Sequence, residues 1–141
     1  MQLGKWGHLT SHVEIVRRGY EAFAAHNPAP VLEFLDDNVE WVVPAELPYG
    51  GTYVGRDGVV QMLMALAPHF AEQGVEPRRF IDAGDIVVAE GRHFGRPAGG
   101  DEFSSGFATV FEFQHGKITR VREYVDATIV LAVRAAASQA G

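Results

Sequence analysis

An acidic side chain stands among apolar ones in the segment FATVFEFQHGKITRVREYVD, residues 107–126. Alternate side chains of a β-strand share one face of the sheet. If the segment forms two paired strands, residues 107, 109, 111 and 113 share a face with residues 119, 121, 123 and 125, and Glu123 is the charged member of that set. A carboxyl group between apolar walls has a raised pKa, which suits a general acid or base. The alternative is a carboxylate at the rim of the sheet, paired with an arginine.

A second candidate for acid/base chemistry is His93, on the strand-like run IVVAEGRHFG. Histidine exchanges protons near neutral pH, and Gly91 on the same face leaves space for a ligand. If both side chains enter one cavity, Glu123 and His93 can share a proton and either can be the base; the alternative is a structural histidine. The predicted substrate-binding residues around this pair are Trp41, Tyr53, Tyr20, Phe107, Thr109 and Val121.

Composition limits the classes of function. The chain has 141 residues and no cysteine, which predicts one domain without disulfides, thiolate metal sites or a cysteine nucleophile. A net charge of −6 disfavours nucleic acid as a partner. No apolar run approaches the roughly 20 residues of a membrane span, so we expect a cytoplasmic protein with no membrane partner. His8 and His12 have the spacing of a metal pair but lack a third ligand, and nucleotide-binding motifs are absent, so we expect no metal and no cofactor.

Three N-terminal helices are predicted before the strand-rich half of the chain. Apolar residues recur at helical spacing, and Ser11 with Glu14 forms a capping box at the start of the first helix. The loop Pro44–Gly55, rich in proline and glycine, is typical of a binding lid or rim. Residues 1–10 are expected to form an arm, and residues 131–141 a C-terminal tail, of a single domain covering residues 1–141. The expected helix limits are, in order, Ser11 to Asn27, Pro28 to Asp36, and Arg56 or Asp57 to Pro68.

The second half of the chain predicts consecutive antiparallel strands, beginning with a short one at Phe80–Asp82. The last two are joined by a hairpin whose three-residue loop, residues 114–116, pairs Phe113 with Lys117. Helices followed by strands predict an α+β fold, with three helices packed on a strongly bent, mostly antiparallel sheet. Gly91 and Gly106 are expected near the points of bending.

Several segments resemble one known family. They are YEAF near the start, DDNVEW, PYGGTYVGRDGV, GDIVVAEG and FATVFEFQHGKITRVREYVD. Together they closely resemble the SnoaL-like branch of the nuclear-transport-factor-2-like (NTF2-like) superfamily, from about Val13 to Val130. The resemblance implies a cone-shaped α+β barrel, with three helices on a bent mixed sheet around an apolar pocket. Members include polyketide cyclases, ketosteroid isomerase and limonene epoxide hydrolase, so the resemblance does not fix one reaction.

The resemblance also implies roles for the two titratable candidates. Glu123 falls where the epoxide hydrolase and the SnoaL cyclases carry a functional aspartate. His93 falls where the hydrolase carries its second aspartate, and Gly91 where it carries the arginine between them. Without that arginine, epoxide hydrolysis by the same apparatus is not expected.

The site of ketosteroid isomerase is not reproduced as such. That enzyme has a base near the strand that ends at Pro44, an acid in its oxyanion hole and a tyrosine on its first helix. The corresponding positions here are Trp41, Val42 or Val43 for the base, the neighbourhood of Thr109 for the acid, and Gly19 or Tyr20 for the tyrosine.

The leading hypothesis is a small cofactor-independent enzyme of the isomerase, cyclase or hydrolase type. It would act on a hydrophobic, carbonyl-bearing small molecule, with Glu123 as the base and His93 or Tyr53 as the donor to the developing enolate. A non-catalytic module that binds a small molecule in the same cavity is the first alternative, and a dimeric structural protein with a vestigial pocket is the second. We also expect a homodimer through the outer sheet face, where helices do not cover the apolar side chains of Ala108, Val110, Ile118 and Tyr124.

Overall fold

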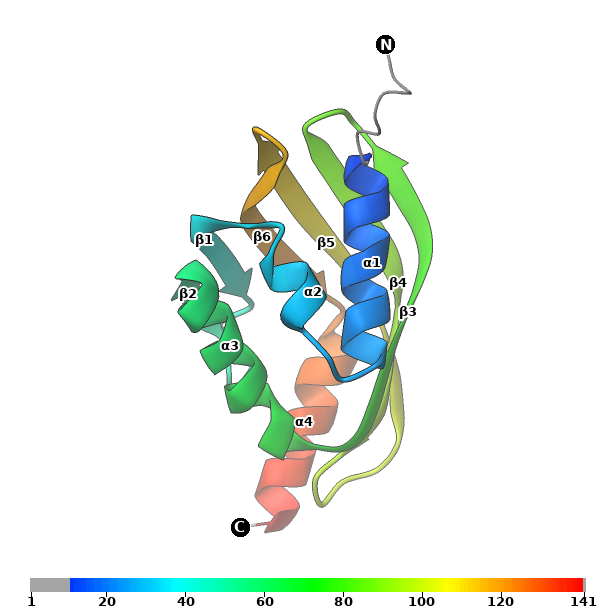
Figure 1. The fold of residues 1–141 in the computed structure, drawn as a ribbon. Coiled ribbons are helices and arrows are strands. Elements are labelled where there is room, and N and C mark those ends of the chain that lie inside the picture. Colours follow the sequence, from blue (N-terminus) through cyan, green and yellow to red (C-terminus); the bar gives the residue numbers. More distant parts are fainter. Residues whose placement is uncertain (1–10, 141) are drawn as a thin grey trace.

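A computed structural model describes residues 11–140 of the chain, so the expected arm and His8 lie outside the described residues. In the described part, four α-helices accompany a six-stranded mixed sheet (Figure 1). The helices are α1 (His12–Ala24), α2 (Ala29–Leu32), α3 (Gly55–Leu66) and α4 (Ala127–Ala140), with a 3-10 turn at Ala67–His69. The strands are β1 (Leu35–Val43), β2 (Gly51–Val54), β3 (Phe70–Asp82), β4 (Ile86–Pro97), β5 (Phe103–Gln114) and β6 (Lys117–Val125).

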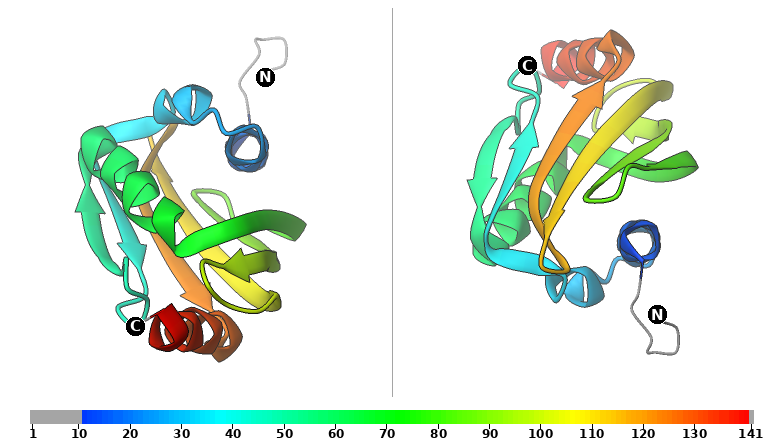
Figure 2. Two further views of the ribbon diagram at one scale, coloured as in Figure 1. Left: turned by 90° about the horizontal axis from the view of Figure 1, so that it is seen from below. Right: turned by 90° about the horizontal axis from the view of Figure 1, so that it is seen from above.

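The sheet is bent but open, with the strand order β2-β1-β6-β5-β4-β3. All neighbouring strands are antiparallel except β1 and β6, which are parallel. Because β2 and β3 end the order without pairing with each other, the sheet does not close into the barrel that the family resemblance implied. Helices α1, α2 and α3 lie over its concave face (Figures 1 and 2). The mixed, mostly antiparallel α+β layout is confirmed.

The first helix begins at the predicted N-cap, Ser11. The Ser11 side chain accepts a hydrogen bond from the backbone N–H of Glu14 at 3.1 Å, which satisfies one of the free donors of the first turn. Ile15 and Val16 are buried and turn the apolar side of α1 toward the sheet.

The hairpin between β5 and β6 differs from the predicted one. Gln114 pairs with Lys117 across a two-residue loop, in which His115 and Gly116 both have positive φ. This shortening by one residue alone would turn β6 over. A β-bulge at Thr119 returns the later side chains of β6 to the predicted face. It does so because the register between β5 and β6 shifts by one residue between Glu112 and Phe113. The inward direction of Glu123 is therefore preserved by two compensating differences.

One residue near the hairpin was assigned to the wrong face. Ile118 was expected on the outer face of the sheet, but it pairs with Phe113 on the loop side of the bulge and is buried inside. The bulge explains the error, since it breaks the strict alternation of β6 between Ile118 and Arg120.

Strand β3 is much longer than the strand expected at Phe80–Asp82, because only those residues had a strand-like pattern in the sequence. It lies at the edge of the sheet, where a proline is tolerated, and the register shifts between Pro77 and Arg79. Gly91 pairs with Pro77, and a Cβ atom there would lie 2.0 Å from the backbone oxygen of Glu76. The predicted free space beside Gly91 is thus wrong: the backbone of β3 occupies it.

The C-terminal segment expected as a tail is helix α4, which lies across one end of the sheet (Figure 2). Ile129 and Val133 are buried, and the backbone N–H of Ile129 donates a hydrogen bond to Ser105 Oγ at 3.2 Å. This anchoring of its first turn explains why α4 is part of the domain. Within residues 11–140 no helix is long and apolar enough to cross a membrane.

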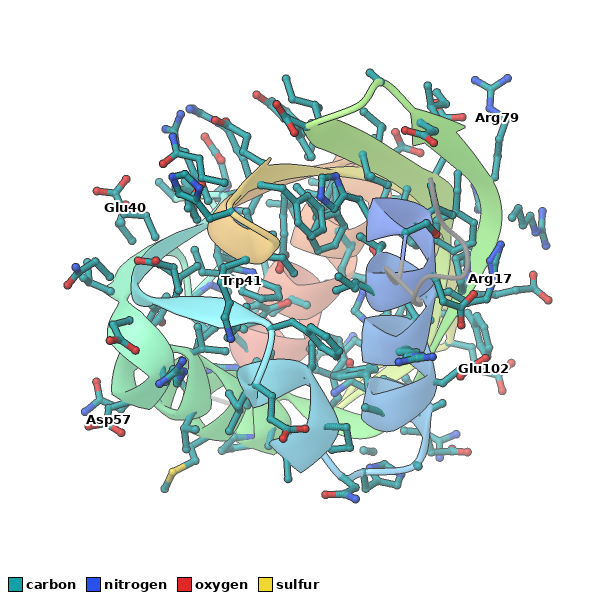
Figure 3. All side chains as sticks on the ribbon, turned by 45° about the horizontal axis from the view of Figure 1, so that its top comes forward. Arg17, Glu40, Trp41, Asp57, Arg79 and Glu102 are labelled. Atoms are coloured by element: carbon teal, nitrogen blue, oxygen red, sulfur yellow. The ribbon has the colours of Figure 1, made fainter. Side chains whose placement is uncertain are left out.

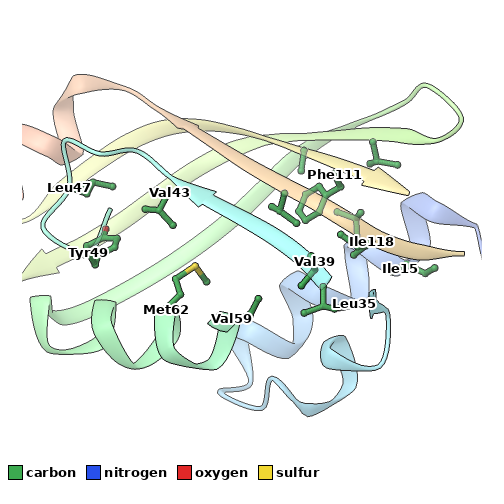
Figure 4. Packing of buried hydrophobic residues seen from close by; sticks show 14 of the residues in the cluster. Ile15, Leu35, Val39, Val43, Leu47, Tyr49, Val59, Met62, Phe111 and Ile118 are labelled. Atoms are coloured by element: carbon green, nitrogen blue, oxygen red, sulfur yellow. The ribbon is translucent and has the colours of Figure 1, made fainter. Parts of the chain in front are cut away.

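The main core lies between α3 and strand β1. Val59 and Met62 of α3 face Val39 and Val43 of β1, and all four are almost completely buried (Figure 4). The predicted lid, residues 44–55, contributes to this core because its Leu47 and Tyr49 side chains are buried and its last residues form β2. The segment is therefore packed into the core and is part of the fold that surrounds the interior cavity.

Candidate functional site

A cavity of about 170 Å³ lies between the concave face of the sheet and helices α1, α2 and α3. An apolar cavity of about 150 Å³ is large enough for benzene, so this one can hold a small organic molecule. Its walls are almost entirely aliphatic and aromatic, and β5 and β6 form the floor. The polar side chains that line it are Tyr20, Trp41, Tyr49, Gln73, His93, Thr109 and Glu123.

Glu123 enters this cavity from β6, and among residues 11–140 its carboxyl has one direct hydrogen-bond donor. Trp41 Nε1 donates to Glu123 Oε2 at 2.7 Å. Strand β1 runs parallel to β6 with Trp41 paired to Val121, which brings the indole beside the carboxyl. Figure 3 shows Trp41 in the interior and its neighbour Glu40 pointing outward, as strand alternation requires.

The surroundings of Glu123 favour its uncharged form. Burial raises the pKa of the Glu123 carboxyl above its ordinary value of 4.5, and the hydrogen bond from Trp41 partly offsets this rise. Within residues 11–140, no lysine or arginine lines the cavity. The predicted alternative, a rim carboxylate paired with an arginine, does not describe this residue.

Thr109 and Tyr20 form a second polar group close to Glu123. Thr109 pairs with Glu123 across β5 and β6, which puts both side chains on the concave face. Tyr20 reaches the cavity from α1, with its ring 6.0 Å from that of Phe107. Burial and the nearby Glu123 carboxylate raise the pKa of Tyr20, while a hydrogen bond with the Thr109 side chain partly opposes this effect. The Tyr20 hydroxyl therefore keeps its proton and can donate it in a hydrogen bond.

His93 lies elsewhere in the same cavity. Its Nε2 atom is 2.9 Å from Gln73 Oε1, and its ring is 5.3 Å from the rings of Phe70 and Phe103. Burial lowers the pKa of His93 to about 4. The hydrogen bonds of Glu123 and His93 go to different partners, so the proton shared between them that the sequence suggested is not present.

The register of the strands explains this separation. Thr109 pairs with Glu123 on one side and with Ala89 on the other, and His93 lies four residues beyond Ala89. On a regular sheet, this places the Cα atoms of Glu123 and His93 about 13 Å apart along the strands and about 10 Å apart across them. Bending shortens the distance between side chains on the concave face, but the two groups still occupy different parts of the cavity.

Four of the six predicted substrate-binding residues line the cavity, namely Tyr20, Trp41, Phe107 and Thr109. Val121 is fully buried beneath the cavity wall, between Trp41 and Phe111. Tyr53 is turned away, and its hydroxyl donates to the backbone oxygen of Tyr49 at 2.7 Å. That bond uses the proton that Tyr53 would need as an enolate donor.

Sequence reasoning missed two polar lining residues, Tyr49 and Gln73. Tyr49 lies in the segment interpreted as a loop, where an aromatic residue between proline and glycine was the available signal. Gln73 lies in the part of β3 that was not predicted as a strand. Within residues 11–140 no three potential metal ligands converge.

The fold, with a cavity between the bent sheet and its helices, is that of an NTF2-like protein. The model of the SnoaL-like domain family matches residues 16–121, and the chain belongs to that family. This result confirms the resemblance noted in the sequence. No curated protein matches the chain.

Solved structures show the same fold. An NTF2-like protein of unknown function from Burkholderia pseudomallei is 29% identical, with a TM-score of 0.78, covering 84% of this chain and 92% of that one. TerC, co-crystallised with polyporic acid, is 26% identical, with a TM-score of 0.71 and coverages of 82% and 91%. A putative SnoaL-like polyketide cyclase from Jannaschia is 19% identical, with a TM-score of 0.75 and coverages of 92% and 99%, and shows the fold alone.

Proposed function

We propose that this protein is a cofactor-independent enzyme that removes and returns a proton next to a carbonyl group of a small, hydrophobic substrate. The observation that carries the proposal is the Glu123 carboxyl, held by Trp41 in a cavity with apolar walls. A carboxylate in such a setting is a stronger base than one in water, because burial raises its pKa. The similarity to TerC, which was co-crystallised with polyporic acid, supports a small organic ligand in this fold.

The reaction needs one base and one hydrogen-bond donor. The ionised Glu123 carboxylate takes the proton from the carbon beside the carbonyl, and the electrons of the broken C–H bond move to the carbonyl oxygen. The Tyr20 hydroxyl, beside Glu123 and protonated, donates a hydrogen bond to the resulting enolate oxygen. Return of the proton from Glu123 to another carbon completes an isomerisation. Alternatively, the enolate carbon attacks a second carbonyl, and the oxygen of that carbonyl takes the proton from Glu123, which completes a cyclisation.

Exchange of hydrogen for deuterium tests this step without knowledge of the natural substrate. We expect the protein to accelerate exchange of the protons beside the carbonyl of 1-tetralone in D₂O, followed by proton NMR. The variant Glu123→Gln should slow the enzymatic exchange at least about 100-fold, whereas Glu90→Gln, on the outer face beside Arg79, should not. Exchange no faster than in buffer, or equal exchange by Glu123→Gln and the wild type, would refute the enzyme. Binding of 1-tetralone without exchange would favour the alternative of a small-molecule binding module.

The outer sheet face remains a proposed homodimer interface. Ala108 and Val110 lie on this face, and Tyr124 is 51% exposed there beside Arg122. Ile118, which faces inward, is no longer part of the proposed interface. Sedimentation velocity at micromolar concentration should show a dimer that Tyr124→Lys dissociates. A wild-type protein that sediments only as a monomer of about 15.4 kDa would contradict this assembly.

A further inference from the structure

The proposed proton transfer uses Glu123 and Tyr20 but leaves a polar pair in the same cavity without a role. This pair is His93 with Gln73, on the neighbouring strands β4 and β3. Placing an imidazole and an amide against apolar walls costs free energy unless their polar atoms are paired. The Gln73–His93 hydrogen bond satisfies one ring nitrogen only.

The other ring nitrogen of His93 is available to a ligand. Nε2 faces the oxygen of Gln73 at 2.9 Å, so Nε2 carries the proton and donates it. In a neutral imidazole the remaining atom, Nδ1, is then an acceptor. Among residues 11–140, the imidazole of His93 has no hydrogen bond other than the one to Gln73. Because burial holds the pKa of His93 at about 4, the ring is neutral in neutral solution.

Between this nitrogen and Glu123 the cavity is apolar. Phe107 and Val125 form the cross-strand pair that lies between the level of Thr109 with Glu123 and the level of Ser105 with His93. Both Phe107 and Val125 line the cavity. A molecule that touches both polar groups must therefore be apolar in its middle.

We propose that the ligand is a flat molecule of about two fused rings that carries its carbonyl at the Glu123 end and a hydroxyl at the other end, where His93 Nδ1 accepts the hydroxyl proton. The placement of the carbonyl rests on the proposed function. The placement of the hydroxyl rests on the Gln73–His93 pair alone. The cavity of about 170 Å³ is close in size to one that holds benzene, which favours a compact molecule over a longer chain of separate rings.

Three probes that differ at one end test this proposal: 1-tetralone, 6-hydroxy-1-tetralone and 6-methoxy-1-tetralone. In each substituted probe the added group lies across the two rings from the carbonyl. Calorimetric titration should show that the hydroxyl tightens binding by roughly fivefold to tenfold, the effect of one hydrogen bond. The methoxy group, which has no proton to donate, should give no gain. Equal binding of the hydroxyl and unsubstituted probes, or an equal gain from methoxy, would overturn the proposal.

Variants locate the effect in the protein. In His93→Phe the preference for the hydroxyl should disappear, while affinity for 1-tetralone stays within about twofold. His93→Gln, which keeps an acceptor, should retain part of the preference and serves if His93→Phe does not fold. His69→Phe is the matched control, because His69 packs on Tyr49 outside the cavity lining and should leave the preference intact. A preference that persists in both His93 variants at wild-type strength would overturn the assignment.

The experiment separates this inference from the proposed enzyme. If the hydroxyl preference depends on His93 but no proton exchange occurs, the two-ended ligand stands and the proposed function fails. If exchange occurs with no hydroxyl preference, the enzyme stands and the two-ended ligand fails.

Discussion

The two ends of the cavity hold titratable groups of opposite kind that respond to the same cause. At one end, burial raises the pKa of the Glu123 carboxyl, and at the other it lowers the pKa of the His93 imidazole to about 4. In both cases burial disfavours the charged form, because apolar walls solvate charge poorly. The ends differ in their neighbours: a donor, Trp41, faces the acid, and an acceptor, Gln73, faces the histidine. The cavity therefore presents complementary hydrogen-bonding ends while its interior stays close to neutral.

Removing the acid should change how stability depends on pH. The folded pKa of Glu123 lies above the unfolded value of 4.5, so the folded state binds more protons than the unfolded state once the pH exceeds that value. The contribution of Glu123 to stability is thus fully present below pH 4.5 and is lost as the pH rises through the folded pKa. Relative to Glu123→Gln, the wild type should lose about 1.4 kcal/mol of unfolding free energy per unit of that pKa rise.

Urea denaturation of both proteins from pH 4 to pH 9 measures this difference. Parallel curves for wild type and Glu123→Gln would show that the carboxyl is solvated in the folded state, and the raised pKa would then be rejected.

Removing the histidine should change the pH dependence of stability with the opposite sign. The folded pKa of about 4 lies below the ordinary value of 6.5, so acid favours the unfolded state between these values. The wild type should lose up to roughly 3 kcal/mol relative to His93→Gln as the pH falls through this range. Thermal unfolding at pH 7 and pH 4.5 gives the measurement. A loss in His93→Gln equal to that of the wild type would place the acid sensitivity elsewhere.

The sequence predicted the acid end better than the histidine end. Glu123 is visible because it breaks an apolar pattern of period two, and strand alternation survived the errors in the hairpin. A shorter loop and a bulge at Thr119 each shift the register by one residue, and their sum keeps the same face inward. The predicted direction of Glu123 is correct because the two register shifts add up to two residues. A shift of two residues leaves the same side chains on the inner face of the sheet.

The histidine end could not be predicted as well, because it depends on contacts between segments far apart in the sequence. Gln73 lies in the part of β3 that precedes the expected strand Phe80–Asp82. This part also contains Gly74 and Pro77, both of which an edge strand tolerates. Helix α4 was missed because its apolar residues were interpreted as a tail, and its anchoring to Ser105 is visible only in the fold. Tyr53 was predicted to lie in the site because of its residue type, but its hydroxyl donates a hydrogen bond to the backbone oxygen of Tyr49.

Trp41→Phe should weaken the acid end alone, with an effect of about 1–3 kcal/mol on the unfolding free energy. The variant keeps an aromatic ring and removes the N–H that donates to Glu123 Oε2. Because that hydrogen bond lowers the pKa of Glu123, its loss should raise this pKa further, which a carbon NMR titration of the carboxyl can follow. In the background of Glu123→Gln the pH-dependent part of the effect should vanish. If it persists there, the indole acts through packing and not through the carboxyl.

The smallest effect on the unfolding free energy is expected for Glu90→Gln. Because Glu90 is an exposed glutamate, this variant tests whether the effect of Glu123→Gln depends on burial or only on residue type. Glu90 follows Ala89 on β4 and points to the outer face, where Arg79 Nε donates to its Oε1 atom at 2.8 Å and 41% of its side chain is exposed. Exposed ion pairs contribute about 0–1 kcal/mol and are screened by salt. Glu90→Gln should therefore change the unfolding free energy by less than about 1 kcal/mol and leave its pH dependence between pH 5 and pH 8 like that of the wild type. If this variant reproduced the pH response of Glu123→Gln, that response would come from the loss of any negative charge, and the special position of Glu123 in the cavity would lose its main support.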